Sequence, residues 1–501
     1  MMWSLSLLVS IASLIPRSLC ADGLVVSTTS GELHGFIDHS TPLVRKFLGV
    51  PYAEPPVGDL RFAPPQTKTS NGVVNATDFG PSCMQQFSNG STIYTAQVPQ
   101  FLISGGQSED CLYLHIWAPA LKTEYPQELA LPVFLYIPGG GFTGGGSNSI
   151  AKIPDQWIQR TQSHIVIVMN YRVNVFGFPN AKGLTDLNPG LLDQRKAVEW
   201  TRDNIAAFGG DPKRITLWGQ SAGGASSNVY GYAYPEDPIV SSLISDSGSA
   251  NLRYSSDTEQ SNFTSLAGLV GCGNLEPEPE LSCVRNVSAT DLENALSYYG
   301  INGTKPAISF TPFPDNKTAF GNITDRAVRG LVAKIPAILG SNANEGAGFV
   351  PYTDSGPGEA SLFTATQSII ACPLSVEVKA RNMIGLPTYR YQYAGNFSNI
   401  SPVSWFGAYH SSELPLLFGT HDQVFDGPST AFEYNVSHAM QAFWLSFASN
   451  PSAGPARWTK EEGYLAWPEY RQNTSSMVLF AEGQTLQSLV SGSRIDSKCK
   501  S

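Results

Sequence analysis

The pentapeptide GQSAG at residues 219–223 is the feature that most constrains how this chain folds. It directly follows the apolar run ITLW at 215–218, and small residues continue after it. A buried strand that runs into such a pentapeptide and then into a Gly/Ala/Ser-rich segment predicts a strand, a sharp elbow and a helix. That geometry lifts the Ser221 hydroxyl above a sheet and places it at a helix N-terminus. Because the chain holds 47 glycines, the pentapeptide alone also fits a glycine-rich loop with a bystander serine.

A second glycine-rich turn lies about eighty residues upstream. The apolar run LPVFLYI at 131–137 predicts a buried strand, and it ends in PGGGF at 138–142. Successive glycines allow backbone N–H groups to point toward one place without obstruction from side chains. Such donors stabilise the negative oxygen that develops when a nucleophile attacks a carbonyl carbon. The two turns together therefore indicate acyl transfer.

Further motifs extend over most of the chain. They are GVPYAEPPVG at 49–58 with LRF at 60–62, SEDCLYL at 108–114, NIAAFGGDP at 204–212, and the late residues Met440, Trp444, Phe447, Trp467 and Tyr470. With these motifs the chain resembles the type-B carboxylesterases, the cholinesterase-like branch of the α/β-hydrolases, and in particular secreted fungal carboxylesterases. The resemblance implies an α/β-hydrolase fold, with a large, mixed, mostly parallel central sheet flanked by helices. It also implies a serine carboxylic-ester hydrolase that needs no metal and no organic cofactor.

Apolar strand signals are spread through the whole chain. They lie at 165–169, 243–244, 337–339 and 389–393. Since no low-complexity linker or internal repeat interrupts them, we expect one α/β-hydrolase domain over residues 21–501. A hairpin signal at 24–26, with a turn near Gly31, predicts antiparallel strands at one edge of the sheet.

The N-terminus predicts export. Residues 3–15 form an apolar run too short to span a bilayer, and it is followed by PRSLC at 16–20, with cleavage expected after Cys20. This pattern predicts a secretory signal peptide over residues 1–20. No hydrophobic anchor signal follows later, so we expect a secreted, extracellular protein without a membrane anchor. The net charge of −10, with no basic cluster, argues against nucleic acid as a partner; the oligomeric state is not determined by these features.

Cysteine usage is consistent with an oxidising compartment. Without Cys20, the chain's seven cysteines become six, an even number. The residues alone leave the pairing open. The resemblance implies the pairs Cys83–Cys111 and Cys272–Cys283, which leave Cys372–Cys499 as the third.

Asparagine usage predicts a glycoprotein, because the chain carries eleven N-x-S/T sequons. They are Asn75, Asn89, Asn262, Asn286, Asn302, Asn316, Asn322, Asn396, Asn399, Asn435 and Asn473.

A serine hydroxyl needs a base and an orienting acid, and in this fold the chain order is serine, acid, histidine. Only His410, His421 and His438 follow Ser221. His410 occupies the family's catalytic position, before a glutamate and an apolar segment, whereas we expect His421 and His438 to be structural or exposed.

Glu345 is the candidate acid, because it lies in the loop GSNANEG at 340–346, which matches the family's G-x-N-x-x-E-G pattern. Its carboxylate would accept a hydrogen bond from His410 Nδ1–H and stabilise the imidazolium. The resemblance further implies that the backbone N–H groups of Gly140, Gly141 and Ala222 form the oxyanion hole.

Residues around this triad have family counterparts with supporting roles. Ser247 matches a residue that supports the triad acid. Two buried structural ion pairs are expected, Arg61 with Glu109 and Arg172 with Asp193.

Three departures from the family bear on the substrate. Pro138 replaces a His or Tyr, Gln220 replaces the glutamate that cholinesterases carry beside the nucleophile, and the Cys83–Cys111 loop has no Trp. That Trp binds choline through a cation–π contact in cholinesterases, so a choline-ester specialist is not expected.

The same loop shows one short apolar cluster, at 98–103, and no clear amphipathic helix that would form a lipase lid. We therefore expect an esterase of soluble or short-to-medium-chain esters. The alternatives are a lipase acting on long-chain acylglycerols, an amidase, and a non-catalytic cholinesterase-like binding protein.

Overall fold

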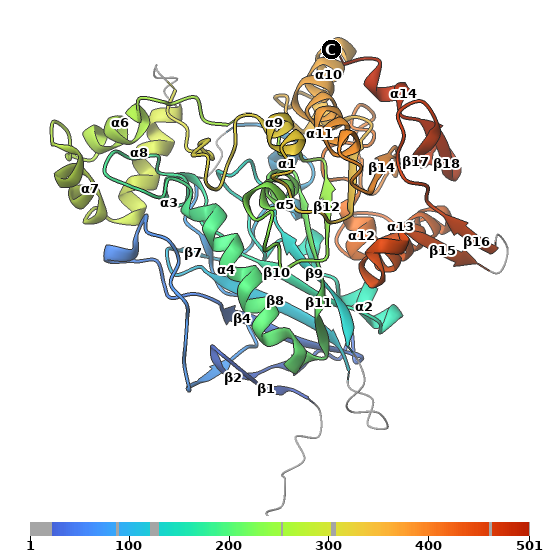
Figure 1. Ribbon diagram of the computed structural model, residues 1–501, viewed down its shortest axis with the longest axis horizontal. Helices are drawn as coiled ribbons and strands as arrows, with labels where there is room; N and C mark the ends of the chain where they lie inside the picture. Colours follow the sequence, from blue (N-terminus) through green and yellow to red (C-terminus); the bar gives the residue numbers. More distant parts are fainter. Residues whose placement is uncertain are drawn as a thin grey trace, which may run out of the picture.

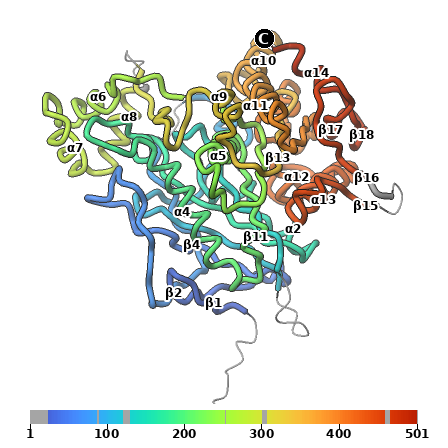
Figure 2. Tube along the Cα trace, viewed as in Figure 1, coloured from blue at the N-terminus to red at the C-terminus, as the bar shows by residue number. Residues whose placement is uncertain are grey.

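The computed structural model describes residues 23–86, 90–120, 130–251, 254–301, 307–459 and 463–499. The expected signal peptide lies outside the described residues, as do the sequon asparagines Asn89 and Asn302. Figure 1 shows a central sheet with helices packed against it, and Figure 2 shows the strands β1 and β2 on the opposite side of the view from the C-terminus.

Eleven strands form one mixed sheet in the order β18-β17-β14-β13-β12-β11-β9-β10-β8-β4-β3. Its centre is parallel and consists of β10 (Ile165–Met169), β9 (Leu131–Ile137), β11 (Gly210–Gln220), β12 (Ser242–Asp246), β13 (Ala337–Asn342), β14 (Thr388–Tyr393) and β17 (Ser475–Glu482). Every apolar run that predicted a buried strand lies in it. Parallel strands need continuous apolar sequence, because helices cover both faces.

The edges of the sheet are antiparallel. One edge contains β8 (Tyr113–Pro119), β4 (Val44–Pro51) and β3 (Phe36–Ile37), and the other contains β18 (Thr485–Ser491). The expected mixed, mostly parallel α/β architecture is confirmed.

The N-terminal hairpin is present, but its predicted place was wrong. β1 (Val25–Thr28) and β2 (Gly31–His34) pair antiparallel, and with β5 (Val73–Asn75) they form a separate three-stranded sheet. The chain passes β4 at Gly35 so closely that a Cβ there would lie 2.5 Å from the Lys46 carbonyl oxygen. After this glycine β3, and not the hairpin, takes the edge position beside β4.

Side chains of β9 alternate between two apolar clusters. Val133, Leu135 and Ile137 face one layer, whereas Phe134 and Tyr136 face the other. The first layer contains α4 (Pro189–Asn204), α5 (Ala222–Ala233) and α11 (Cys372–Met383), and the second contains α2 (Asp155–Thr161), α12 (Leu414–Phe418) and α13 (Ala431–Ser449). The sheet is therefore covered on both faces.

Smaller elements surround these layers. A satellite cluster, at one corner of Figure 1, contains α3 (Asn174–Gly177), α6 (Ser261–Leu269), α7 (Pro277–Arg285) and α8 (Ala289–Ile301). Further helices are α1 (Ile93–Ala96), α9 (Ile323–Val328), α10 (Glu359–Ala365), a π-helical turn at Thr366–Ala371, and α14 (Ser493–Asp496). Two short strand pairs also lie outside the main sheet, β6 (Ser82–Cys83) with β7 (Gln107–Ser108) and β15 (Ala456–Thr459) with β16 (Gly463–Ala466).

Three disulfides are present, Cys83–Cys111, Cys272–Cys283 and Cys372–Cys499, which are the pairs expected from the resemblance. The last one ties the C-terminal segment to α11.

The sequon asparagines differ in accessibility. Those with exposed side chains are Asn75, Asn286, Asn316, Asn322, Asn396, Asn435 and Asn473, and Asn262 is half-buried. Asn399 is 7% exposed, and its Nδ2 donates hydrogen bonds to the His421 carbonyl oxygen, Ser429 Oγ and Glu433 Oε1.

We predict that Asn399 carries no glycan, because attachment at Nδ2 would break this buried network and leave its acceptors unpaired. Enzymatic deglycosylation in ¹⁸O-water followed by peptide mass spectrometry should label exposed sequons such as Asn396, three residues away, and leave Asn399 unlabelled. An ¹⁸O-labelled Asn399 would contradict the prediction.

Candidate active site

Ser221 occupies a strained elbow between β11 and α5, with φ 58° and ψ −123°. Its neighbours have no room for a side chain. A Cβ on Gly219 would lie 2.3 Å from the Gly223 carbonyl, and one on Gly223 would lie 1.9 Å from the Ile137 carbonyl oxygen. The glycines of the pentapeptide therefore allow the turn that presents Ser221 at the start of α5.

Sheet order brings the other candidates to the same edge. The neighbouring parallel strands β11, β12 and β13 lead into Ser221, Ser247 and Glu345, and His410 follows the next strand, β14. Because parallel strands share one carboxyl edge, residues far apart in sequence meet there.

Glu345 and His410 form a buried pair. His410 Nδ1 lies 2.5 Å from Glu345 Oε2. The other carboxylate oxygen, Oε1, accepts hydrogen bonds from Ser247 Oγ and from the Asn342 backbone N–H, both at 2.6 Å. The carboxylate is therefore held on both sides and fixes the ring with Nδ1–H directed toward it.

The other ring nitrogen faces Gln220. Gln220 Nε2 lies 3.2 Å from His410 Nε2, while no hydrogen bond joins Ser221 Oγ to His410 among the described residues. With Nδ1 protonated, Nε2 accepts from the Gln220 amide through the lone pair that would take a proton from Ser221. Such contacts are often long without substrate and shorten in the reactive complex.

Two further buried carboxyls, which the sequence analysis missed, lie beside this pair. Asp246 accepts hydrogen bonds from Trp218 Nε1 and Tyr391 Oη, and Glu413 accepts one from Asn342 Nδ2. Burial, together with the charge of Glu345, raises the pKa of Asp246 to about 7 and that of Glu413 well above its usual value. The place of Asp246 at the carboxyl end of β12, next to Ser247, was the available signal.

The glycine turn after β9 lies against the elbow. Gly140 and Gly141 have φ of 134° and 65°, and the Gly140 carbonyl accepts from the N–H groups of Thr143 and Gly144. Among the described residues no acceptor pairs with the N–H of Gly140, Gly141 or Ala222. These three donors are free for an oxyanion.

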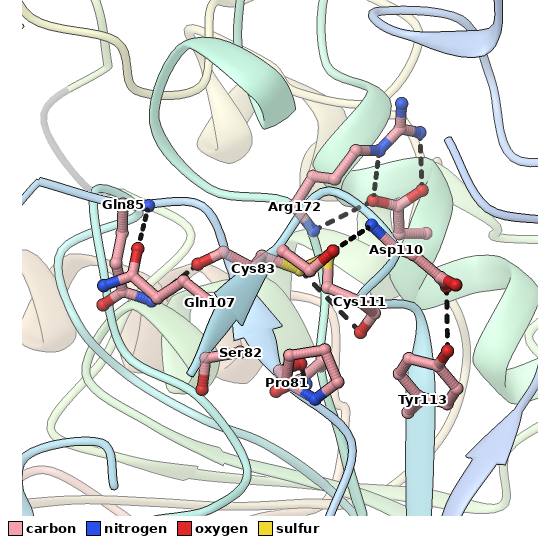
Figure 3. Close-up of a disulfide and its surroundings, with 12 residues drawn as sticks. Pro81, Ser82, Cys83, Gln85, Gln107, Asp110, Cys111, Tyr113 and Arg172 are labelled. Carbon is pink, nitrogen blue, oxygen red and sulfur yellow. Dashed lines mark hydrogen bonds and ion pairs between the residues drawn. A yellow bond between two sulfur atoms is a disulfide. The ribbon is translucent and has the colours of Figure 1, made fainter. Parts of the chain in front are cut away.

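Gln85, another residue the sequence analysis missed, braces this turn. Its Oε1 accepts from the Gly145 N–H at 2.8 Å, and its Nε2 donates to the carbonyl oxygens of Gly145 (2.9 Å) and Cys83 (3.0 Å). Figure 3 shows Gln85 beside the Cys83–Cys111 disulfide, where its N–H donates to Gln107 Oε1 at 2.9 Å. The disulfide loop thus supports the turn.

Both expected ion pairs are present. Arg172, also in Figure 3, makes a bidentate contact with Asp193 at 2.8 and 2.7 Å. Arg61 and Glu109 pair at 2.6 and 2.5 Å. The remaining histidine candidates lie elsewhere: His421 contacts Ser429 at 2.7 Å, and α13 exposes His438.

A cavity of about 640 Å³ opens above Ser221. Its lining includes Gln85, Thr92, Tyr94, Phe101, Leu102, Ile103, Gly139–Gly141, Lys152, Gln220, Phe349, His410 and Leu414. Tyr94 Oη donates to the His410 carbonyl oxygen at 2.6 Å, and the Phe349 ring centroid lies 4.5 Å from that of His410. The disulfide loop therefore forms one wall of the cavity and is tied to the histidine.

Neither a metal cluster nor a membrane-spanning helix is found in the part of the chain that the structure describes. No group of three or more His, Cys, Asp or Glu residues there is placed to hold a metal ion, and no helix there is both long and apolar enough to cross a bilayer.

The carboxylesterase family model matches residues 22–363 and 358–496. The chain belongs to the carboxylesterase family. It is 59% identical to chlorogenic acid esterase from Aspergillus niger, over 96% of this chain and 95% of that protein. It is 39% identical to secreted lipase 5 from Gibberella zeae, over 95% and 94%. It is 30% identical to para-nitrobenzyl esterase from Bacillus subtilis, over 92% and 96%. The protein is thus a carboxylic-ester hydrolase with an α/β-hydrolase fold, and the non-catalytic alternative is set aside.

The Gln85 contacts generate one prediction. Gln85→Ala should lower kcat roughly 10- to 100-fold with a smaller effect on KM, because loosely held oxyanion donors lose stabilisation of the transition state. Gln85→Glu should not restore the rate, since a carboxylate cannot donate to the Cys83 and Gly145 carbonyls. Steady-state kinetics would be compared with Gln66→Ala, an exposed glutamine. An unchanged kcat in Gln85→Ala would contradict this role.

The Gln220 contact generates another. A carboxylate at position 220 would stabilise protonated His410. As the pH falls, His410 would therefore take up a proton, and stop acting as a base, at a higher pH. In Gln220→Glu the acid limb of the kcat/KM profile should therefore move to higher pH, by about one unit. The pH profile of both proteins on a neutral ester tests this; a limb that stays in place or moves to lower pH would show that position 220 does not act on the base.

Proposed function

We propose that this protein is a secreted serine carboxylesterase that forms an acyl-enzyme, with Ser221 as nucleophile, His410 as general base and acid, and Glu345 as orienting acid. The observation that carries the proposal is the convergence of these residues at one edge of the sheet. One cavity there is bordered or adjoined by the Glu345–His410 pair, the strained elbow and the three unpaired backbone donors.

The first half of the reaction forms the acyl-enzyme. Ser221 Oγ attacks the ester carbonyl carbon while His410 Nε2 takes its proton, and the Gln220 amide gives up that nitrogen. Glu345 stabilises the resulting imidazolium through Nδ1–H. The backbone N–H groups of Gly140, Gly141 and Ala222 hold the oxyanion. Collapse of the tetrahedral intermediate breaks the ester bond, and His410 protonates the leaving alcohol.

The second half regenerates the enzyme. A water molecule attacks the acyl carbonyl while His410 accepts one of its protons, and the same donors hold the second oxyanion. The proton returns to Ser221 Oγ as the acid is released. Apart from the ester and this water, every group in this sequence of steps belongs to the chain.

We propose soluble esters with short-to-medium acyl groups as substrates. The disulfide loop supports this choice, because the helices in its described part are limited to the four-residue α1 and a 3₁₀ turn at Pro99–Phe101, and Tyr94 ties it to the His410 carbonyl. A wall held in this way differs from a flap that opens at an oil interface. The name of the 59% identical relative, chlorogenic acid esterase, points the same way.

A long-chain lipase is the second candidate, and the 39% identical relative named secreted lipase 5 favours it. Secretion itself we infer from the N-terminal pattern at residues 1–20, the three disulfides and the name of that same relative.

Hydrolysis of p-nitrophenyl esters from acetyl to palmitoyl tests the function. We expect the highest kcat/KM on short-to-medium chains, with losses of about 10⁶-fold in Ser221→Ala and about 10⁴-fold in Glu345→Gln. His410→Ala should resemble Ser221→Ala, whereas the exposed His438→Asn serves as its matched control. Rates that peak on long chains above their solubility limit would favour the lipase. Turnover that survives in Ser221→Ala would overturn the proposed nucleophile.

A further inference from the structure

Lys152 is a buried cation in the wall of the substrate cavity. It ends the 3₁₀ turn Ile150–Lys152, is 6% exposed, and lines the same cavity as Ser221 and His410. The other described residues that line this cavity are neutral, apart from the titratable ring of His410 and the phenol of Tyr94.

The ammonium of Lys152 makes no hydrogen bond and no ion pair with any residue in the described ranges. The nearest acid along the chain, Asp155, pairs instead with Lys46. Some side-chain nitrogen and oxygen atoms are fully buried and have no hydrogen-bond partner. The Lys152 Nζ atom is not one of them. Since its side chain is otherwise buried and lines the cavity, the ammonium reaches solvent through the cavity.

Such an arrangement is unfavourable for folding alone. An ammonium on a largely buried side chain loses part of its hydration, and no group in the described ranges replaces that part for Lys152. Burial lowers the pKa of Lys152 to about 8, so the side chain remains mostly protonated at neutral pH. A methionine or leucine would fill the same volume without this cost. The position therefore carries a charge that the fold does not use.

We infer that Lys152 is a specificity residue that binds a carboxylate group of the ester substrate, on the acyl or on the alcohol side. The inference rests on the proposed function, because it places this ligand in the cavity above Ser221. An ammonium offers three donors and no acceptor, so a carboxylate fits it better than a hydroxyl or an amide does. Esters that also carry a carboxylate are the substrate class that this chemistry selects.

Matched ester pairs test the inference. On the acyl side, the 4-nitrophenyl monoester of adipic acid would be compared with 4-nitrophenyl heptanoate. On the alcohol side, 4-acetoxybenzoate would be compared with 4-acetoxybenzamide. The readout is the ratio of kcat/KM for the charged ester to that for its neutral partner, in the wild type, Lys152→Met, Lys152→Gln and Lys152→Arg. The exposed Lys213→Met, at the other end of β11 from Ser221, is the matched control.

We expect the ratio to fall roughly 10- to 100-fold in Lys152→Met and Lys152→Gln for at least one pair, as for a lost hydrogen bond to a charged group. It should be retained in Lys152→Arg and Lys213→Met. Thermal unfolding supplies a second readout, because Lys152→Met should melt above the wild type once the unpaired charge is removed. A ratio that stays the same in both neutral variants, for both pairs, overturns the inference.

A binding measurement separates this inference from the proposed function. Titration calorimetry of the charged and the neutral ester of each pair would use Ser221→Ala with and without Lys152→Met. Loss of the carboxylate preference in the double variant supports Lys152 even if Ser221 proves not to be the nucleophile. Equal affinities within both pairs in Ser221→Ala overturn the inference, whereas Ser221-dependent turnover of the neutral esters would still uphold the proposed function.

Discussion

The close backbone contact between the elbow and the strand beside it is the constraint on which the site depends. Gly223 lies against the Ile137 carbonyl, and a Cβ on Gly139 would lie 2.6 Å from the Gln220 carbonyl oxygen. This contact brings the end of β11 and the end of β9 within reach of one another. Ser221 and the glycine turn therefore lie together, because β9 and β11 are parallel neighbours and glycines stand where the turns that follow them meet.

Charge at the candidate site is organised around one carboxylate. Glu345 receives donors from Ser247, Asn342 and His410, while burial raises the pKa values of Asp246 and Glu413. Groups with raised pKa values take up protons near neutral pH and so avoid repulsion with an ionised neighbour. Less negative charge then stands beside Glu345, the carboxylate that faces the imidazole. Lys152 differs from Glu345, because no group of opposite charge pairs with it among the described residues of the chain.

The Cys83–Cys111 loop contacts both the glycine turn after β9 and the backbone of His410. Through Gln85 it supports the turn that carries the unpaired N–H groups of Gly140 and Gly141, and through Tyr94 it contacts the backbone of His410. The same segment forms a wall of the cavity. Changes in this loop can therefore alter the rate of the chemical step as well as the choice of substrate, because one set of hydrogen bonds serves both.

The sequence by itself determined the features that depend on neighbours along the chain. Continuous apolar runs indicated the buried strands, and GQSAG after ITLW indicated the elbow, since steric limits on the backbone act over a few residues. Chain order and the family pattern selected Glu345 and His410. Only the tertiary structure decided which distant side chains meet: the Gln220 amide on His410 Nε2, the brace from Gln85, the carboxyls of Asp246 and Glu413, the unpaired Lys152 and the buried Asn399. It also moved the N-terminal hairpin into a separate sheet. These outcomes depend on strand order and on burial, which are properties of the packed chain. Apart from the place of Asp246 beside Ser247, they leave no local pattern in its sequence.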